Sequence, residues 1–221
     1  AFVVNSSDPP SFSFPDVIGL PGGGFAVVWR DFSNSDPEYS GSIRGQYFDS
    51  AGVAAGSEFV ILADDTNVAG QLEVIGLADD KIVVAWLETI DYDNDIVANG
   101  FQIVDSSGGL VGGPQLVDVF STANTDQSLT TTPGGGFVLG WSGVNPQGTN
   151  ADDTLAWARL YDASGNALGD RFVVADNPGQ FEGLPHAVAL TSGDLVFSWT
   201  GFFNRPSDNS VVSDAFARVL A

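Results

Sequence analysis

Leu20-Pro-Gly-Gly-Gly-Phe-Ala-Val-Val-Trp29 is a glycine-rich turn followed by an apolar strand that ends in tryptophan. The chain repeats this pattern three more times, and the four tryptophans lie 57, 55 and 58 residues apart. The other copies are Leu77-Ala-Asp-Asp-Lys-Ile-Val-Val-Ala-Trp86, Thr132-Pro-Gly-Gly-Gly-Phe-Val-Leu-Gly-Trp141 and Leu190-Thr-Ser-Gly-Asp-Leu-Val-Phe-Ser-Trp199. A fixed period of this size is typical of stacked supersecondary units.

Each repeat predicts four short strands. In the first copy these are residues 16–20, 25–29, 43–48 and 58–62, with turn residues between them. No segment has a helical period over a helix length, so we expect almost no helix.

The two ends of the chain indicate how the repeats are arranged. The last repeat stops after its third strand, residues 215–220, whereas Ala1-Phe-Val-Val-Asn5 matches the fourth strand Arg171-Phe-Val-Val-Ala175. We therefore expect the N-terminal strand to complete the last sheet, which closes a ring and protects its edges. The prediction is one all-β domain over residues 1–221, a single four-bladed β-propeller with four antiparallel strands per blade. Its blades are expected at 12–62, 68–118, 124–175 and 182–221 plus 1–5. A β-sandwich is the alternative fold.

Charge and composition limit the partners. The net charge is −21, there is no cysteine, and only six arginines and one lysine stand against 28 acidic residues. Such a chain repels nucleic acids and anionic membranes, and no apolar run is long enough to be inserted in a membrane. Disulfides and thiolate metal sites are excluded. The acidity is explained either by bound divalent cations or by solubility and adaptation to salt.

The glycine turn, the Phe-x-Val-x-Trp strand and Gly45-Gln46-x-Phe48-Asp49 resemble repeats of bacterial exported proteins. Those β-propeller repeats often accompany haemolysin-type (RTX) calcium-binding segments and adhesins. The resemblance implies export, to the extracellular space or the bacterial cell surface, and structural Ca²⁺. The RTX calcium nonapeptide itself is absent from the chain.

One candidate site comes from aligning the four repeats. Thirteen residues before each repeat tryptophan stand Asp16, Glu73, Ser128 and His186, at the start of the innermost strand. In a propeller these four would form a ring at the central channel, with two carboxylates and the chain's single histidine able to bind a cation or act as acid and base. Solvated strand ends are the alternative interpretation.

A second candidate is the loop Asp91-Tyr-Asp93-Asn94-Asp95. Alternating aspartates suit Ca²⁺, which prefers oxygen ligands, although the loop lacks the glycine and glutamate of an EF-hand. We therefore predict Asp91, Asp93 and Asp95 as metal ligands. The repeat tryptophans and Trp157 are expected in the core.

The main functional prediction is an exported, calcium-stabilised, non-enzymatic binding or adhesion module that recognises a neutral glycan or a protein surface. Two alternatives stay open. One is a small polysaccharide-acting enzyme with a metal-assisted site at the channel, and the other is a component of an extracellular assembly that self-associates through calcium.

Overall fold

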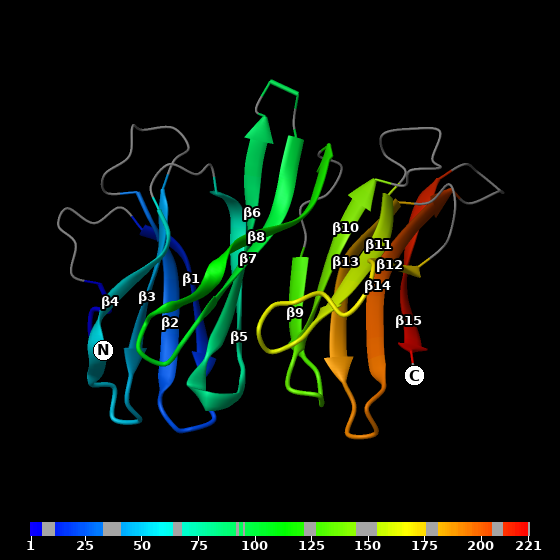
Figure 1. The fold of residues 1–221 in the computed structure, drawn as a ribbon. Helices are drawn as coiled ribbons and strands as arrows, with labels where there is room; N and C mark the ends of the chain where they lie inside the picture. Colours follow the sequence, from blue (N-terminus) through cyan, green and yellow to red (C-terminus); the bar gives the residue numbers. More distant parts are fainter. Residues whose placement is uncertain are drawn as a thin grey trace. The chain divides into compact units, whose positions relative to one another are not determined.

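A computed structural model describes residues 1–5, 12–32, 41–63, 68–91, 93–94, 96–121, 127–144, 154–175, 181–204 and 210–220. The chain divides into two compact units, residues 1–93 with 97–119 and residues 94–96 with 120–221. In the part described, the regular structure is antiparallel strand apart from the short 3₁₀ turn Ala78–Asp80 (Figure 1). The all-β prediction is confirmed.

The first unit holds two four-stranded sheets. One has the order β1-β2-β3-β4 and the other β5-β6-β7-β8. Their strands are β1 (Phe12–Gly19), β2 (Phe25–Asp31), β3 (Ser42–Phe48), β4 (Ala54–Leu62), β5 (Val68–Gly76), β6 (Ile82–Asp91), β7 (Ile96–Val104) and β8 (Leu110–Ser121). The first strands of the two sheets, β1 and β5, contact each other.

The second unit holds a four-stranded sheet of order β12-β11-β10-β9 and a three-stranded sheet, β13-β14-β15. The strands are β9 (Gln127–Thr131), β10 (Phe137–Val144), β11 (Thr154–Tyr161), β12 (Phe172–Ala175), β13 (Phe181–Ala189), β14 (Leu195–Asn204) and β15 (Val211–Leu220). Here too the first strands of the sheets, β9 and β13, contact each other.

Ring closure by the N-terminal strand is not observed. Residues 1–5 form no strand, and the last sheet has three strands in the described residues. The Phe2 ring instead lies 5.4 Å from the Phe48 ring, within the first unit. The phenylalanine of a short apolar segment can pack against another aromatic ring that is within reach. The sequence match of residues 1–5 to the fourth strand therefore did not determine where the segment lies.

The turns of the four repeats share one backbone hydrogen bond. The backbone N–H of the first residue of each turn donates a hydrogen bond to the carbonyl oxygen four residues later. The donor and acceptor pairs are Leu20 and Gly24, Leu77 and Lys81, Thr132 and Gly136, and Leu190 and Asp194. Gly24 has φ +88°, and a Cβ there would collide with the Phe48 carbonyl oxygen. Glycine is therefore required at this position by both conformation and space.

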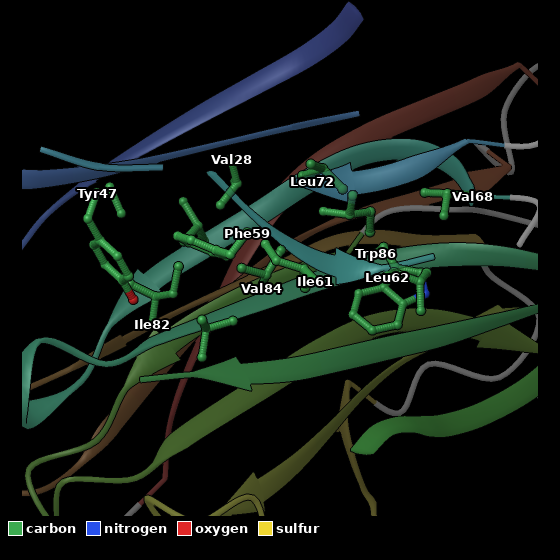
Figure 2. Close-up of a cluster of buried hydrophobic side chains, with 14 residues drawn as sticks. Val28, Tyr47, Phe59, Ile61, Leu62, Val68, Leu72, Ile82, Val84 and Trp86 are labelled. Carbon is green, nitrogen blue, oxygen red and sulfur yellow. The ribbon is translucent and has the colours of Figure 1, made fainter. Parts of the chain in front are cut away.

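The core of the first unit lies between its two sheets (Figure 2). Side chains from β2, β3 and β4 meet side chains from β5 and β6 there, and Trp86 is fully buried among them. Trp29, Trp141 and Trp157 are also buried, whereas Trp199 is partly buried against the core of the second unit. The expectation that these indoles pack in the core is confirmed for the four buried ones and holds in part for Trp199.

Part of the acidity has a local structural role. Asp49, Asp105 and Asp162 occupy the same turn of successive repeats, and one oxygen of each accepts N–H groups two and four residues on. The Ser107 hydroxyl and backbone N–H groups lower the pKa of Asp105, and Asn166 with backbone N–H groups does the same for Asp162. These three carboxylates therefore stabilise turns.

None of the helical segments described is long and apolar enough to cross a membrane.

Candidate active site

The strand register places the four ring candidates at equivalent positions. Each one pairs with the residue directly before its repeat tryptophan: Asp16 with Val28, Glu73 with Ala85, Ser128 with Gly140 and His186 with Ser198. The alignment of the repeats at this position is thus the alignment seen in the sheets. A ring of all four residues would span both units and stays a prediction.

A break in the strand pairing precedes this position in three of the four sheets. The register shifts between Ser13 and Asp16 in β1, between Ala69 and Glu73 in β5, and between Gly183 and His186 in β13. A bulge bends a strand and changes the direction of the side chains beside it, and bulges are frequent next to active sites.

Asp16 and Glu73 come together in the first unit. They line a cavity of about 230 Å³ with Phe14, Pro15 and Leu72. The cavity is large enough to hold several water molecules or a small ligand. Two carboxyl groups thus face a space of the size of a small ligand.

Backbone N–H groups hold Asp16 in place. One carboxylate oxygen accepts the N–H of Val17 at 2.8 Å, and the other accepts the N–H of Val74, in the neighbouring strand β5, at 3.1 Å. The second bond links β1 to the residue that follows Glu73. Asp16 is therefore fixed relative to the Glu73 backbone.

Glu73 differs from an ordinary surface glutamate. Burial, followed by the negative charge of Asp16, raises its pKa from 4.5 to about 7. Glu73 therefore keeps its proton up to a pH near 7, well above the range in which an ordinary glutamate loses it. A carboxyl that keeps its proton near neutral pH can act as a general acid.

This pKa predicts a pH-dependent effect of Glu73→Gln on stability. Between pH 4.5 and about 7 the unfolded chain loses the Glu73 proton while the folded chain keeps it, so this group's contribution to stability falls as pH rises. The full shift corresponds to about 3 kcal/mol, and solvent screening of a half-buried carboxyl reduces this to about 1–2 kcal/mol. Thermal unfolding should show the variant equal to or below wild type near pH 4.5 and gaining steadily on it up to pH 7. A constant difference across this range would contradict the assignment.

The equivalent positions of the second unit have a different chemistry. The Ser128 hydroxyl is buried and donates a hydrogen bond to the Pro185 carbonyl, directly before His186. The Thr130 hydroxyl donates to the Ala187 carbonyl at 2.6 Å. His186 itself is exposed. These hydroxyls connect β9 to β13, so Ser128 has a structural role.

The predicted calcium loop is described only in part. The Asp93 N–H donates to Asp91 Oδ1 at 3.1 Å, where Asp91 is the last residue of β6, whereas Asp95 falls outside the described residues. Over the residues that can be examined, no group of three or more acidic, histidine or cysteine side chains could hold a metal ion. Calcium binding by Asp91, Asp93 and Asp95 stays a prediction.

Sequence reasoning missed two residues beside the cavity, Phe14 and Arg30. Phe14 lines the cavity, and the Arg30 guanidinium lies 5.4 Å from the centre of its ring. A signal was present in the sequence, since Pro15 precedes Asp16 as Pro185 precedes His186. Proline in a strand is found at bulges and edges, so this pair marked irregular backbone at the ring position.

No family model and no curated protein sequence matches the chain. Solved structures do match. An α-L-arabinanase from Penicillium chrysogenum, solved with arabinobiose, is 14% identical with a TM-score of 0.65, over 95% of this chain and 62% of that one. The GH93 α-L-arabinofuranosidase of Fusarium graminearum, also solved with arabinobiose, is 12% identical with a TM-score of 0.64, over 98% and 65%. A PL25 ulvan lyase is 8% identical with a TM-score of 0.53, over 96% and 55%.

These likenesses show the fold, which is of the β-propeller type. The chain spans less than two thirds of the length of each of these three solved chains. They also overturn the prediction of a non-enzymatic binding or adhesion module, because these three solved chains are carbohydrate-active enzymes. That prediction gave too little weight to the carboxyls, since in a chain with 28 acidic residues no particular pair stands out from the sequence.

Proposed function

We propose that the chain is a glycan-cleaving enzyme whose active site is the cavity between β1 and β5. The observation that carries the proposal is that Glu73, whose pKa is raised to about 7, lies beside the Asp16 carboxyl in a cavity of about 230 Å³. Support comes from the fold, which this chain shares with carbohydrate-active enzymes.

Glycosidic bonds are commonly hydrolysed by a pair of carboxyl groups, one protonated and one charged. In this site Glu73 acts as the general acid and gives its proton to the glycosidic oxygen as the bond to the sugar breaks. Asp16 acts at the anomeric carbon, where it either activates a water molecule or attacks directly. Its two backbone hydrogen bonds keep the carboxylate in position for this role.

We assign a neutral polysaccharide as the substrate class. Among the residues that the structure describes, those lining the cavity include two carboxyls and no basic side chain, and the whole chain has a net charge of −21. A uronate-containing or sulfated polymer would be repelled both at long range and within the site. Arabinan is the first substrate to try, because two of the solved chains with this fold were solved with arabinobiose.

The experiment is to incubate the purified chain with linear arabinan, other neutral polysaccharides and a uronate polymer, and to measure the release of reducing ends. We expect release from a neutral polysaccharide and none from the uronate polymer. Cleavage of the uronate polymer alone, with formation of an unsaturated product, would contradict the assignment and indicate a lyase.

The pH dependence of cleavage should follow Glu73. Because the general acid must carry its proton, kcat/KM is expected to fall about tenfold for each pH unit above about 7. The measurement is initial rate at low substrate concentration from pH 4 to 9, together with circular dichroism at each pH to verify the fold. An alkaline limb that begins near pH 4.5 would mean that Glu73 is not the acid.

A further inference from the structure

The cavity has an exposed aromatic wall with an unusual backbone. Phe14 has φ +53°, a conformation that a bulky residue rarely adopts, and it lies inside the bulge between Ser13 and Asp16. Its side chain is 43% exposed although it is large and apolar. Both the strained backbone and the exposure of an apolar ring to solvent lower the stability of the fold. Backbone strain of this kind is concentrated at ligand sites.

A buried arginine supports this ring. Arg30 is only 6% exposed and follows Trp29 in β2, where it pairs with Ser13. Its guanidinium lies 5.4 Å from the centre of the Phe14 ring and 4.7 Å from that of Phe32. A nitrogen of the same group, Nη2, donates a hydrogen bond to the Val68 carbonyl in β5.

Arg30 thus connects the two strands that form the cavity. A guanidinium is planar and stacks on aromatic rings while its N–H groups remain available for hydrogen bonds in the ring plane. Here one side chain contacts the bulge of β1 and the start of β5 together. The buried Arg30 side chain therefore contributes to the position of Phe14 together with the bulge.

We propose that Phe14 is a stacking platform for one sugar residue of a neutral glycan and that Arg30 is the positioning residue that holds it. The inference rests on the proposed function and names the part of the site that binds the substrate. A sugar ring presents C–H groups on its face, and these pack on the electron-rich face of an aromatic ring. Phe14 precedes Asp16 by two residues, so a sugar stacked on it lies next to the carboxyl pair.

The test compares Phe14→Ala, Phe14→Leu and Phe14→Tyr for the cleavage of linear arabinan. Loss of the aromatic face in the Ala and Leu variants should raise KM by about tenfold, the equivalent of about 1.4 kcal/mol, with kcat changed by less than about threefold. The Tyr variant keeps the ring and should stay within about twofold of wild type. The Leu variant keeps most of the apolar volume of the side chain. Its KM can therefore still be measured if the Ala variant does not fold.

Phe2 provides the matched control. It is 57% exposed, lies in the same unit and does not line the cavity. Phe2→Ala should leave KM unchanged. An equal rise of KM in the Phe2 and Phe14 variants would overturn the proposal, because it would indicate a general loss of structure.

Arg30 is tested through Phe14. Arg30→Gln keeps a donor for the Val68 carbonyl but removes the stacked cation. KM should therefore rise when Arg30→Gln is introduced into the wild-type chain, and it should not rise further when Arg30→Gln is introduced into the Phe14→Ala variant. Additive increases of KM would show that Arg30 acts independently of the platform.

Binding separates this inference from the proposed function. Arabinobiose is titrated by calorimetry into Glu73→Gln with and without Phe14→Leu. If arabinobiose binding depends on Phe14 and the wild-type chain cleaves no glycan, the result supports Phe14 as a stacking platform and rejects the proposed enzymatic function. If cleavage depends on Glu73 while arabinobiose binding and KM do not change with Phe14, the result rejects Phe14 as a stacking platform and supports the proposed enzymatic function.

Discussion

Glu73→Gln is expected to lower kcat for glycan cleavage by about 10²–10⁴-fold, which is the usual contribution of a general acid. Gln keeps the shape of the side chain but has no proton to give to the leaving oxygen. KM should change little, because binding is assigned to Phe14 and the rest of the cavity. The measurement is steady-state kinetics on linear arabinan, with the fold verified by thermal unfolding at the same pH.

Glu88→Gln is the matched control for this variant. Glu88 is also half-buried, on β6, and does not line the cavity. Its Oε2 accepts the Trp86 indole N–H at 3.5 Å, a role that an amide oxygen can keep. Activity within about twofold of wild type is expected. If both variants lost activity equally, the loss would not be specific to the proposed acid.

Trp86→Ala should destabilise the first unit by about 3–5 kcal/mol. Trp86 is fully buried in the core between the two sheets, and Gly100 packs directly against its indole. Because neighbouring backbone cannot move in far enough to fill the space of an indole, the variant keeps a cavity. Calorimetric unfolding of the variant should show a transition well below that of wild type.

Trp199→Ala is the comparison, since Trp199 is only partly buried. It should cost clearly less than Trp86→Ala. Equal costs, or an unchanged transition for the Trp86 variant, would contradict the packing described for the first unit.

The repeat was predictable because its signals are local. The glycine turns and the apolar strand before each tryptophan determine turn geometry and strand register within some ten residues, and the register of the four ring positions follows from them. The place of residues 1–5 was not predictable in this way. Phe2 matches Phe172 in the sequence, yet it contacts Phe48. A sequence match between two strands does not show which other strand lies close enough to pair with either of them.

The site was predictable in part. Alignment of the repeats identified Asp16 and Glu73, but the raised pKa of Glu73 depends on burial and on the charge from a neighbouring strand. The role proposed for Phe14 depends on a bulge that residue identity alone does not reveal. Export and calcium remain predictions from the sequence, whereas closure of the ring by residues 1–5 is not observed.

The most direct measurement is the titration of Glu73 by ¹³C NMR, with and without arabinobiose. The chain has five glutamates, so a carboxyl-labelled sample gives few signals and Glu73→Gln assigns the one of interest. We predict a midpoint near 7 that falls only part of the way toward 4.5 in Asp16→Asn, because burial remains, and that rises when arabinobiose displaces water from the cavity. A midpoint near 4.5 that arabinobiose does not change would contradict the claim that this carboxyl pair is a glycan-cleaving site.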